Sequence, residues 1–205
     1  MKIKICGMKL TSNIIEVSKI NPDYMGFIFW EKSKRFFSGN IPNISENIKK
    51  TGVFVDSPIN VILNKIKKHD LNAIQLHGDE SIDFCKKIKL LSDIEIIKVF
   101  KVNANFNFNK ILSFDKVCDY YLFDTKGKLP GGNGFHFDWD ILKKYPYKKK
   151  FFLSGGIGLL DINNLKKILK LNLPIHAIDV NSKFEFRNGI KNVNDLSNFK
   201  KQLLL

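Results

Sequence analysis

The chain has 205 residues, and its 44% of hydrophobic and 12% of aromatic residues can fill a substantial core, which excludes a disordered protein. Its formal net charge of +14 comes almost entirely from lysines spread along the chain, since only Arg35 and Arg187 are arginines, so we expect solvated basic faces and no dedicated nucleic-acid partner. No apolar run reaches the roughly 18 residues that a membrane helix needs, and the N-terminus lacks a signal-peptide pattern, so we expect a cytoplasmic protein without membrane contact.

Short apolar runs predict eight β-strands, which alternate with longer amphipathic segments. In chain order the predicted strands span residues 2–6, 24–30, 51–56, 73–77, 95–100, 120–124, 151–155 and 177–181. The clearest helix is SPINVILNKIKKHD, where Ser57 is a candidate N-cap and Pro58 fits the first helical position. The asparagine-rich segment 103–114 is the weakest predicted helix, and VNDLSNFKKQLLL (193–205) predicts an eighth.

This unbroken alternation predicts an α/β protein with one domain over residues 1–205, a single (β/α)8 TIM barrel with eight parallel strands. The chain is shorter than the roughly 250 residues typical of that fold, so its loops must be short. A doubly wound open sheet is the alternative. Such a sheet normally has a glycine-rich phosphate turn after its first strand, and CGMKLT (6–11) is not one.

The three cysteines differ in their sequence surroundings. Cys6, Cys85 and Cys118 are odd in number, far apart and free of CxxC spacing, so the sequence predicts neither a disulfide framework nor a metal site. Cys85 has helical spacing from neighbouring isoleucines and Cys118 precedes an apolar strand, so both are interpreted as packing residues. Cys6 ends the first strand directly before a glycine, where a ligand can approach the backbone, so it is a candidate for chemistry.

Polar residues and glycines gather at the carboxyl ends of the predicted strands, which is where the active site of a (β/α)8 barrel lies. These ends carry Cys6-Gly7, Asp56, His77-Gly78, Asp124-Thr125, Ser154-Gly155-Gly156 and Asn181-Ser182. The loops after strands seven and eight of such barrels commonly bind phosphate through backbone N–H groups. The residues of this predicted phosphate site are Gly155, Gly156, Asn181 and Ser182.

Three further side chains suit a site at these strand ends. Asp124 ends an apolar strand well before the next predicted helix, so it is a candidate general acid and not a helix cap. His77 follows the fourth strand, where a lone histidine either supports the scaffold or contacts a substrate. Arg35 follows the second strand, and a planar guanidinium among so many lysines indicates carboxylate recognition, with a surface arginine as the alternative.

Seven blocks in this order resemble phosphoribosylanthranilate isomerases of tryptophan biosynthesis: KIKICG, GFIFWEKSKR, GVFVD, IQLHGDE, LFDTKGKLPGGNGFHFDW, FFLSGGI and AIDVNSKFE. The resemblance runs from the first strand to about Lys191. It implies a cofactor-free Amadori rearrangement of N-(5′-phosphoribosyl)anthranilate to 1-(o-carboxyphenylamino)-1-deoxyribulose 5-phosphate. The partner is then this small phosphosugar-anthranilate substrate, and we expect a monomer or a homodimer.

The resemblance also implies roles for individual residues. Cys6 matches the general base, Asp124 the general acid, and Arg35 the residue that meets the anthranilate carboxylate. A thiolate suits the base because the ordinary pKa of a thiol, about 8.5, is close enough to neutrality to be tuned by a nearby positive charge. The expected substrate-binding residues are Arg35, His77, Gly155, Gly156, Asp179, Asn181 and Ser182.

One departure from the family pattern lies in the phosphate loop. Similar proteins usually have serine-glycine after the eighth strand, whereas Ser182 is followed here by Lys183. A glycine at that position permits positive φ and close access to the backbone, so the geometry of this loop is open.

Several other readings of the sequence stay open. A histidine-pathway isomerase would carry an aspartate at the position of Cys6, and an indole-glycerol-phosphate synthase would need catalytic lysine and glutamate residues and an extra N-terminal segment. A basic binding module and a decayed, inactive barrel are the non-enzymatic alternatives.

The alternation of side chains along a strand makes one structural prediction. If Cys6 faces the barrel interior, Lys4 faces the same way, while Ile3 and Ile5 face the helices. An unpaired ammonium inside the barrel would be costly, and Asp179 lies on the inward face of the eighth strand, next to the first. We therefore predict an interior Lys4–Asp179 ion pair that places positive charge near Cys6.

Overall fold

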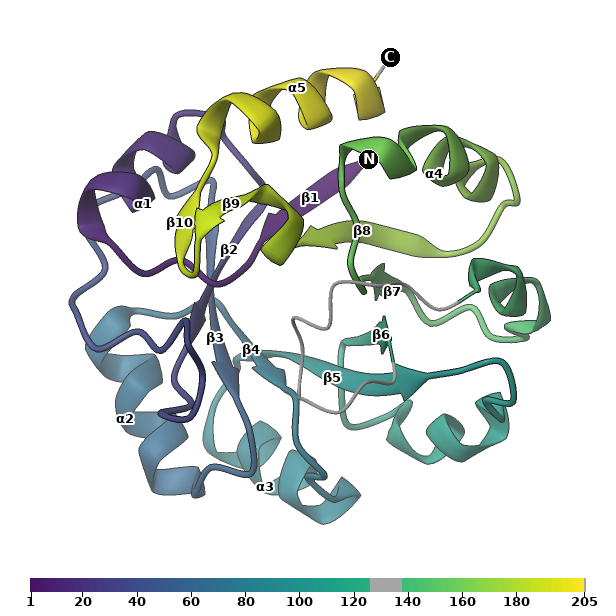
Figure 1. Ribbon diagram of the computed structural model, residues 1–205. Helices are drawn as coiled ribbons and strands as arrows, with labels where there is room; N and C mark the ends of the chain where they lie inside the picture. Colours follow the sequence, from purple (N-terminus) through teal and green to yellow (C-terminus); the bar gives the residue numbers. More distant parts are fainter. Residues whose placement is uncertain (126–137, 205) are drawn as a thin grey trace.

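A computed structural model describes residues 1–125 and 138–204 of the chain; the middle of the LFDTKGKLPGGNGFHFDW block, residues 126–137, lies outside them. Eight parallel strands pair in chain order and β1 pairs with β8, so the sheet closes into a barrel (Figure 1). The closed barrel confirms the predicted fold. Its strands are β1 Lys2–Ile5, β2 Tyr24–Ile28, β3 Lys49–Phe54, β4 Ala73–Leu76, β5 Glu95–Val102, β6 Tyr120–Thr125, β7 Phe151–Leu153 and β8 Ile175–Val180.

Helices surround the barrel on its outer side (Figure 1). The α-helices are α1 Thr11–Ser18, α2 Ile59–His69, α3 Ile82–Leu91, α4 Ile162–Leu169 and α5 Val193–Leu204. The 3₁₀ helices are η1 Phe108–Phe114, η2 Trp139–Lys144, η3 Leu159–Asp161 and η4 Ser182–Phe184. Among these, α5 confirms the predicted last helix.

The connections differ from a regular series of eight helices. Residues 29–48, between β2 and β3, run through turns and extended chain without a helix. The segment 103–114 contains only the 3₁₀ helix η1, because Asn107 turns its side chain back onto the backbone N–H of Asn109 (2.9 Å) and so favours a tight turn.

The predicted N-cap of the second helix is wrong. Pro58 occupies the N-cap of α2 in an extended conformation (φ −57°, ψ 145°), and no side chain caps the helix. Because the helix therefore begins one residue later than expected, Ser57 lies outside the cap position.

Two apolar clusters lie on the two sides of the barrel wall. The larger cluster packs between strands and helices and contains Ile3 and Ile5, as the alternation along β1 predicts. The smaller cluster contains Tyr24, which pairs in register with the inward-facing Lys4 and so fills the barrel interior. Its buried members are Tyr24, Ala73, Ile97, Val99, Leu122, Phe152 and Ala177.

Beyond β8 the chain forms a small antiparallel hairpin that the sequence did not predict. Its strands are β9 Glu185–Arg187 and β10 Ile190–Lys191, and Figure 1 shows it beside β1 and α1, before the chain enters α5. Within residues 1–125 and 138–204, no helix is both long and apolar enough to span a membrane.

Candidate active site

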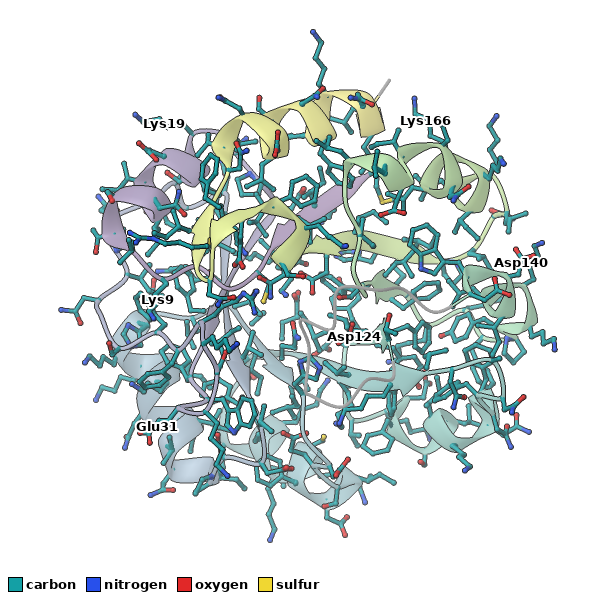
Figure 2. All side chains as sticks on the ribbon, viewed as in Figure 1. Lys9, Lys19, Glu31, Asp124, Asp140 and Lys166 are labelled. Atoms are coloured by element: carbon teal, nitrogen blue, oxygen red, sulfur yellow. The ribbon has the colours of Figure 1, made fainter. Side chains whose placement is uncertain are left out.

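A pocket of about 250 Å³ lies at the carboxyl ends of the strands. Asp124, at the end of β6, lies inside the ring of strands in Figure 2, whereas the labelled Lys19 and Lys166 lie on its outer side. Asp56 does not line the pocket; its Oδ1 accepts a hydrogen bond from the backbone of Asp79 (2.7 Å). The predicted site residues that do line it are Cys6, Arg35, His77, Asp124, Gly156, Asp179, Asn181 and Ser182.

Cys6 lies one residue beyond β1, where the ladder with β8 still holds its backbone. Its N–H donates to the carbonyl of Val180 (2.9 Å), and the residue is only 4% exposed. A Cβ added at Gly26, on the neighbouring β2, would lie 2.7 Å from the Cys6 sulfur. The missing side chain of Gly26 therefore provides the space that the thiol occupies.

The predicted ion pair inside the barrel is confirmed. Lys4 Nζ lies 2.8 Å from Asp179 Oδ1, with the lysine side chain fully buried and that of Asp179 6% exposed. The two residues are also in register across the β1–β8 pair, which closes the barrel. Burial alone would lower the pKa of the Lys4 ammonium, but the carboxylate of Asp179 and the nearby Cys6 outweigh it, so this pKa is raised and Lys4 carries its charge at neutral pH.

Cys6 is subject to two opposing effects. Burial and, to a smaller extent, the Asp179 carboxylate disfavour the thiolate and raise the pKa of Cys6, while Lys4 and, less strongly, Lys191 act to lower it. The net direction is upward, so the resting group at neutral pH is a thiol. The positive charge expected beside Cys6 is present, but without substrate it only offsets part of the cost of burial.

Three polar side chains, Gln75, His77 and Asp124, lie in a row across the pocket, and Asp124 is the last of them. The ring of His77 faces Gln75 on one side, where His77 Nδ1 lies 3.3 Å from Gln75 Nε2, and presents its Nε2 on the other side. That Nε2 lies 3.3 Å from Asp124 Oδ2, although without hydrogen-bond geometry. The other carboxylate oxygen of Asp124 accepts from the backbone N–H of Thr125 (2.9 Å). His77 is thus placed to orient Asp124.

The loop after β7 has the positive-φ backbone expected of an anion site, whereas the loop after β8 does not. Gly155 and Gly156 have positive φ (102° and 68°), which glycine adopts at little cost, and a Cβ at Gly155 would collide with Thr125 Oγ1. Lys183 is not among the described residues with positive φ, so the loop after β8 is formed without the glycine of the family pattern. The Cβ of Lys183 lies 3.1 Å from the position that a Cβ would take at Gly158, so the loops after β7 and β8 are in contact.

Arg35 lines the pocket with its guanidinium already paired to a carboxylate of the protein. Arg35 Nε and Nη2 both donate to Glu185, with distances of 2.6 to 3.0 Å, and Nη2 also reaches Asn188 Oδ1 at 3.2 Å. One bidentate edge of the guanidinium is therefore in use. The sequence prediction for Arg35 concerned a substrate carboxylate, and the structure adds a second carboxylate that the sequence analysis missed.

Comparison with known proteins places this geometry in a family. A model of N-(5′-phosphoribosyl)anthranilate (PRA) isomerase matches residues 3–202 of the chain. The chain belongs to this isomerase family. The N-(5′-phosphoribosyl)anthranilate isomerase of Parabacteroides distasonis is 38% identical over 211 residues, which cover 100% of this chain and 94% of the relative.

Solved structures of PRA isomerases share the barrel. The phosphoribosyl anthranilate isomerase of Thermotoga maritima has 28% sequence identity and a TM-score of 0.83, over 100% of this chain and 98% of its own. A PRA isomerase in complex with reduced 1-(o-carboxyphenylamino)-1-deoxyribulose 5-phosphate has 27% identity and a TM-score of 0.81, with the same coverage. PRA isomerases act in tryptophan biosynthesis, so the family expected from the sequence is confirmed, and the two sister barrels and the basic binding module are set aside.

Sequence analysis gave no role to Gln75, Gly26, Glu185 and Lys191, which contact residues of the site. Gln75 could have been found, because alternation along AIQLH puts it on the face of His77. Gly26 lies inside an apolar run, where a glycine gives no sign of what it faces. Glu185 and Lys191 lie in or next to a hairpin that the sequence did not predict, and one lysine among so many carries no signal.

Proposed function

We propose that this isomerase converts N-(5′-phosphoribosyl)anthranilate to 1-(o-carboxyphenylamino)-1-deoxyribulose 5-phosphate, with Cys6 as general base and Asp124 as general acid. The observation that supports this most directly is that both side chains line one pocket, together with the loops after β7 and β8 and with Arg35. Both groups can then reach the sugar of one bound substrate.

Asp124 would act first. It donates its proton to the furanose ring oxygen, the bond from that oxygen to C1′ breaks, and the nitrogen lone pair forms the Schiff base. The resting Cys6 thiol loses its proton to solvent water. The thiolate then takes the proton from C2′, and the electron pair of that bond moves toward nitrogen to give an enolamine, which tautomerises to the ketone. The reaction is an isomerisation, so neither an oxidant nor a second substrate is needed.

In this proposal, the positive charge of Lys4 stabilises the thiolate form of Cys6. Since burial raises the pKa of Cys6, the thiolate needs a compensating positive charge, and Lys4 is the largest such influence. Asp179 holds Lys4 in place, so we assign Asp179 to the support of Cys6 and not to a direct substrate contact. His77, beside Asp124, would keep the acid pointed into the pocket.

The two ends of the substrate would bind to different parts of the mouth. Gly155, Gly156, Asn181 and Ser182 would hold the phosphate, since backbone N–H groups in loops with positive φ form concave anion sites. Arg35 would meet the anthranilate carboxylate with the part of its guanidinium that Glu185 does not use.

Turnover of the proposed substrate tests this function. N-(5′-phosphoribosyl)anthranilate is prepared from anthranilate and phosphoribosyl pyrophosphate, and its fluorescence is followed after addition of the purified chain. We expect the fluorescence to fall at a rate proportional to enzyme concentration, with the deoxyribulose product, which has the same mass as the substrate, identified by the ketone signal in its carbon NMR spectrum. A chain that binds the product analogue but never turns the substrate over would be an inactive barrel, and the proposal would be wrong.

A further inference from the structure

The guanidinium of Arg35, which lines the pocket, is bound to a carboxylate of the protein. Its Nε and Nη2 edge is held by Glu185, whose side chain is 4% exposed, while that of Arg35 is 13% exposed. Within the part of the chain that the structure describes, Nη1 has no hydrogen-bond partner. Glu185 therefore fixes the plane of the guanidinium and leaves a second edge free of these partners.

Glu185 is itself held by a second buried charge. Lys191 Nζ lies 2.7 Å from Glu185 Oε1, and the lysine side chain is fully buried. The same ammonium donates to the side-chain oxygen of Asn181 at 2.6 Å and to its backbone carbonyl at 3.2 Å. An ammonium has three donors, so Lys191 uses all of them on two residues that belong to opposite ends of the substrate site.

The backbone of Lys191 is fixed as well. Asn13, on α1, accepts from the N–H of Lys191 at 2.7 Å and donates to its carbonyl at 3.0 Å. This pair of bonds ties β10 to the outer helix layer. The ammonium is thus presented from a rigid support and not from a free surface chain.

We propose that Glu185 and Lys191 are positioning residues that set the spacing between the carboxylate-binding and phosphate-binding ends of the site. Glu185 orients Arg35, and Lys191 orients Glu185 and Asn181 together, so one buried ammonium links both ends. This inference rests on the proposed function for the identity of the two ends.

Burial lowers the pKa of Lys191 to about 8, while Glu185 opposes that effect. The ammonium is therefore charged at neutral pH. A neutral substitute of similar length would keep the packing and remove the three hydrogen bonds, which makes Lys191→Met the informative change.

The test compares the binding of three stable ligands by calorimetry. They are reduced 1-(o-carboxyphenylamino)-1-deoxyribulose 5-phosphate, the same compound without its ring carboxylate, and the same compound without its phosphate. We expect Glu185→Gln to weaken the complete ligand about tenfold, and to change the affinity of the carboxylate-free ligand by less than about twofold. Lys191→Met should weaken both truncated ligands.

Lys200→Met is the matched control. Lys200 also donates to two backbone carbonyls, of Ile20 at 2.8 Å and of Asn21 at 2.7 Å, and none of these residues lines the pocket. We expect its affinities for all three ligands to equal those of the wild type. If Lys191→Met does not fold, Lys191→Arg replaces it, since arginine keeps the charge but cannot reproduce the three contacts.

Two results would overturn the inference. One is a Glu185→Gln variant that loses affinity for the carboxylate-free ligand as strongly as for the complete one, or loses none at all. The other is a Lys191 variant that lowers thermal stability but leaves every dissociation constant unchanged. Wild-type turnover is measured separately, so ligand binding without turnover would count against the proposed function and not against the positioning role.

Discussion

The two halves of the barrel interior contain opposite kinds of side chain. At the amino ends of the strands, aromatic rings pack edge to face: Tyr24 on Phe152 (5.1 Å between centroids) and Tyr120 on Phe152 (5.5 Å). Toward the carboxyl ends, the interior holds the buried Lys4–Asp179 ion pair. Apolar packing stabilises a closed barrel by itself, whereas a buried ion pair often adds no net stability. The ion pair as a whole is therefore better explained by the proposed chemistry than by a net gain in stability.

This contrast predicts that the acid–base pair affects turnover far more than folding. Cys6→Ala and Asp124→Asn should each lower kcat by about 10²–10⁴-fold, because general acid or base catalysis commonly contributes that much. Both variants should keep the wild-type thermal transition within a few degrees. The measurement is initial rate and thermal unfolding on the same samples. A cysteine variant with near wild-type kcat would remove Cys6 from the mechanism.

Removing only one partner of the interior ion pair should, in contrast to the acid–base variants, strongly lower the stability of the fold. Lys4→Met leaves the Asp179 carboxylate buried without its cation, which should cost about 3–5 kcal/mol in the free energy of unfolding. Urea denaturation measures this loss.

Removing both charges provides the control. The double variant Lys4→Met/Asp179→Leu should recover most of the stability and still turn over slowly, since Cys6 then lacks its compensating charge. A Lys4→Met variant as stable as the wild type would show that Asp179 already finds another partner or solvent.

Gly26 tests how closely the site is fitted to its thiol. A Cβ there would stand 2.7 Å from the Cys6 sulfur and 3.1 Å from the Cys6 Cα, so Gly26→Ala must displace the base. We expect turnover to fall about tenfold or more through misplacement of the base. Gly39→Ala is the control, because a Cβ at Gly39 meets only the Phe37 ring at 3.7 Å, and it should keep full activity. Full activity in Gly26→Ala would mean that the thiol has room to move.

The smallest predicted effect belongs to the amino-end half. His176 stacks on Tyr120 (4.2 Å between centroids), and burial, together with nearby lysines, lowers the pKa of its ring from 6.5 to about 4. The unfolded chain therefore binds a proton below pH 6.5 that the folded protein takes up only near pH 4, so stability falls as the pH drops through that range.

Substitution of His176 removes this contribution. His176→Phe should show a shallower loss of stability between pH 6.5 and pH 4 in urea denaturation, with unchanged kcat at neutral pH. Identical pH dependence in the variant and the wild type would mean that other groups cause the loss.

The sequence predicted the barrel and the strand ends that line the pocket because both follow from periodicity. Alternation along β1 was enough to place Lys4 inside and to predict its pairing with Asp179 at the barrel closure. The sequence could not predict contacts made by segments in which apolar residues do not recur at a regular spacing. The hairpin that carries Lys191 has strands of only two and three residues, too short for any pattern.

Two details of the helix prediction were wrong for a related physical reason, although α2 and α5 form where they were predicted. Ser57 has the right chemistry for a cap, but the extended Pro58 shifted the helix start by one residue, and a boundary error of that size is beyond sequence patterns. The missing helix between β2 and β3 leaves a loop that instead carries Arg35 into the pocket.

The pairing of the first strand with the last has a consequence for synthesis of the protein. Lys4 and Asp179 are 175 residues apart, so Lys4 lacks its carboxylate partner until almost the whole chain has left the ribosome. A growing chain of this kind exposes the edge of β1, with its thiol, for the full time of translation. Cys6 is therefore first enclosed when β8 pairs with β1, after nearly the whole chain has been synthesised.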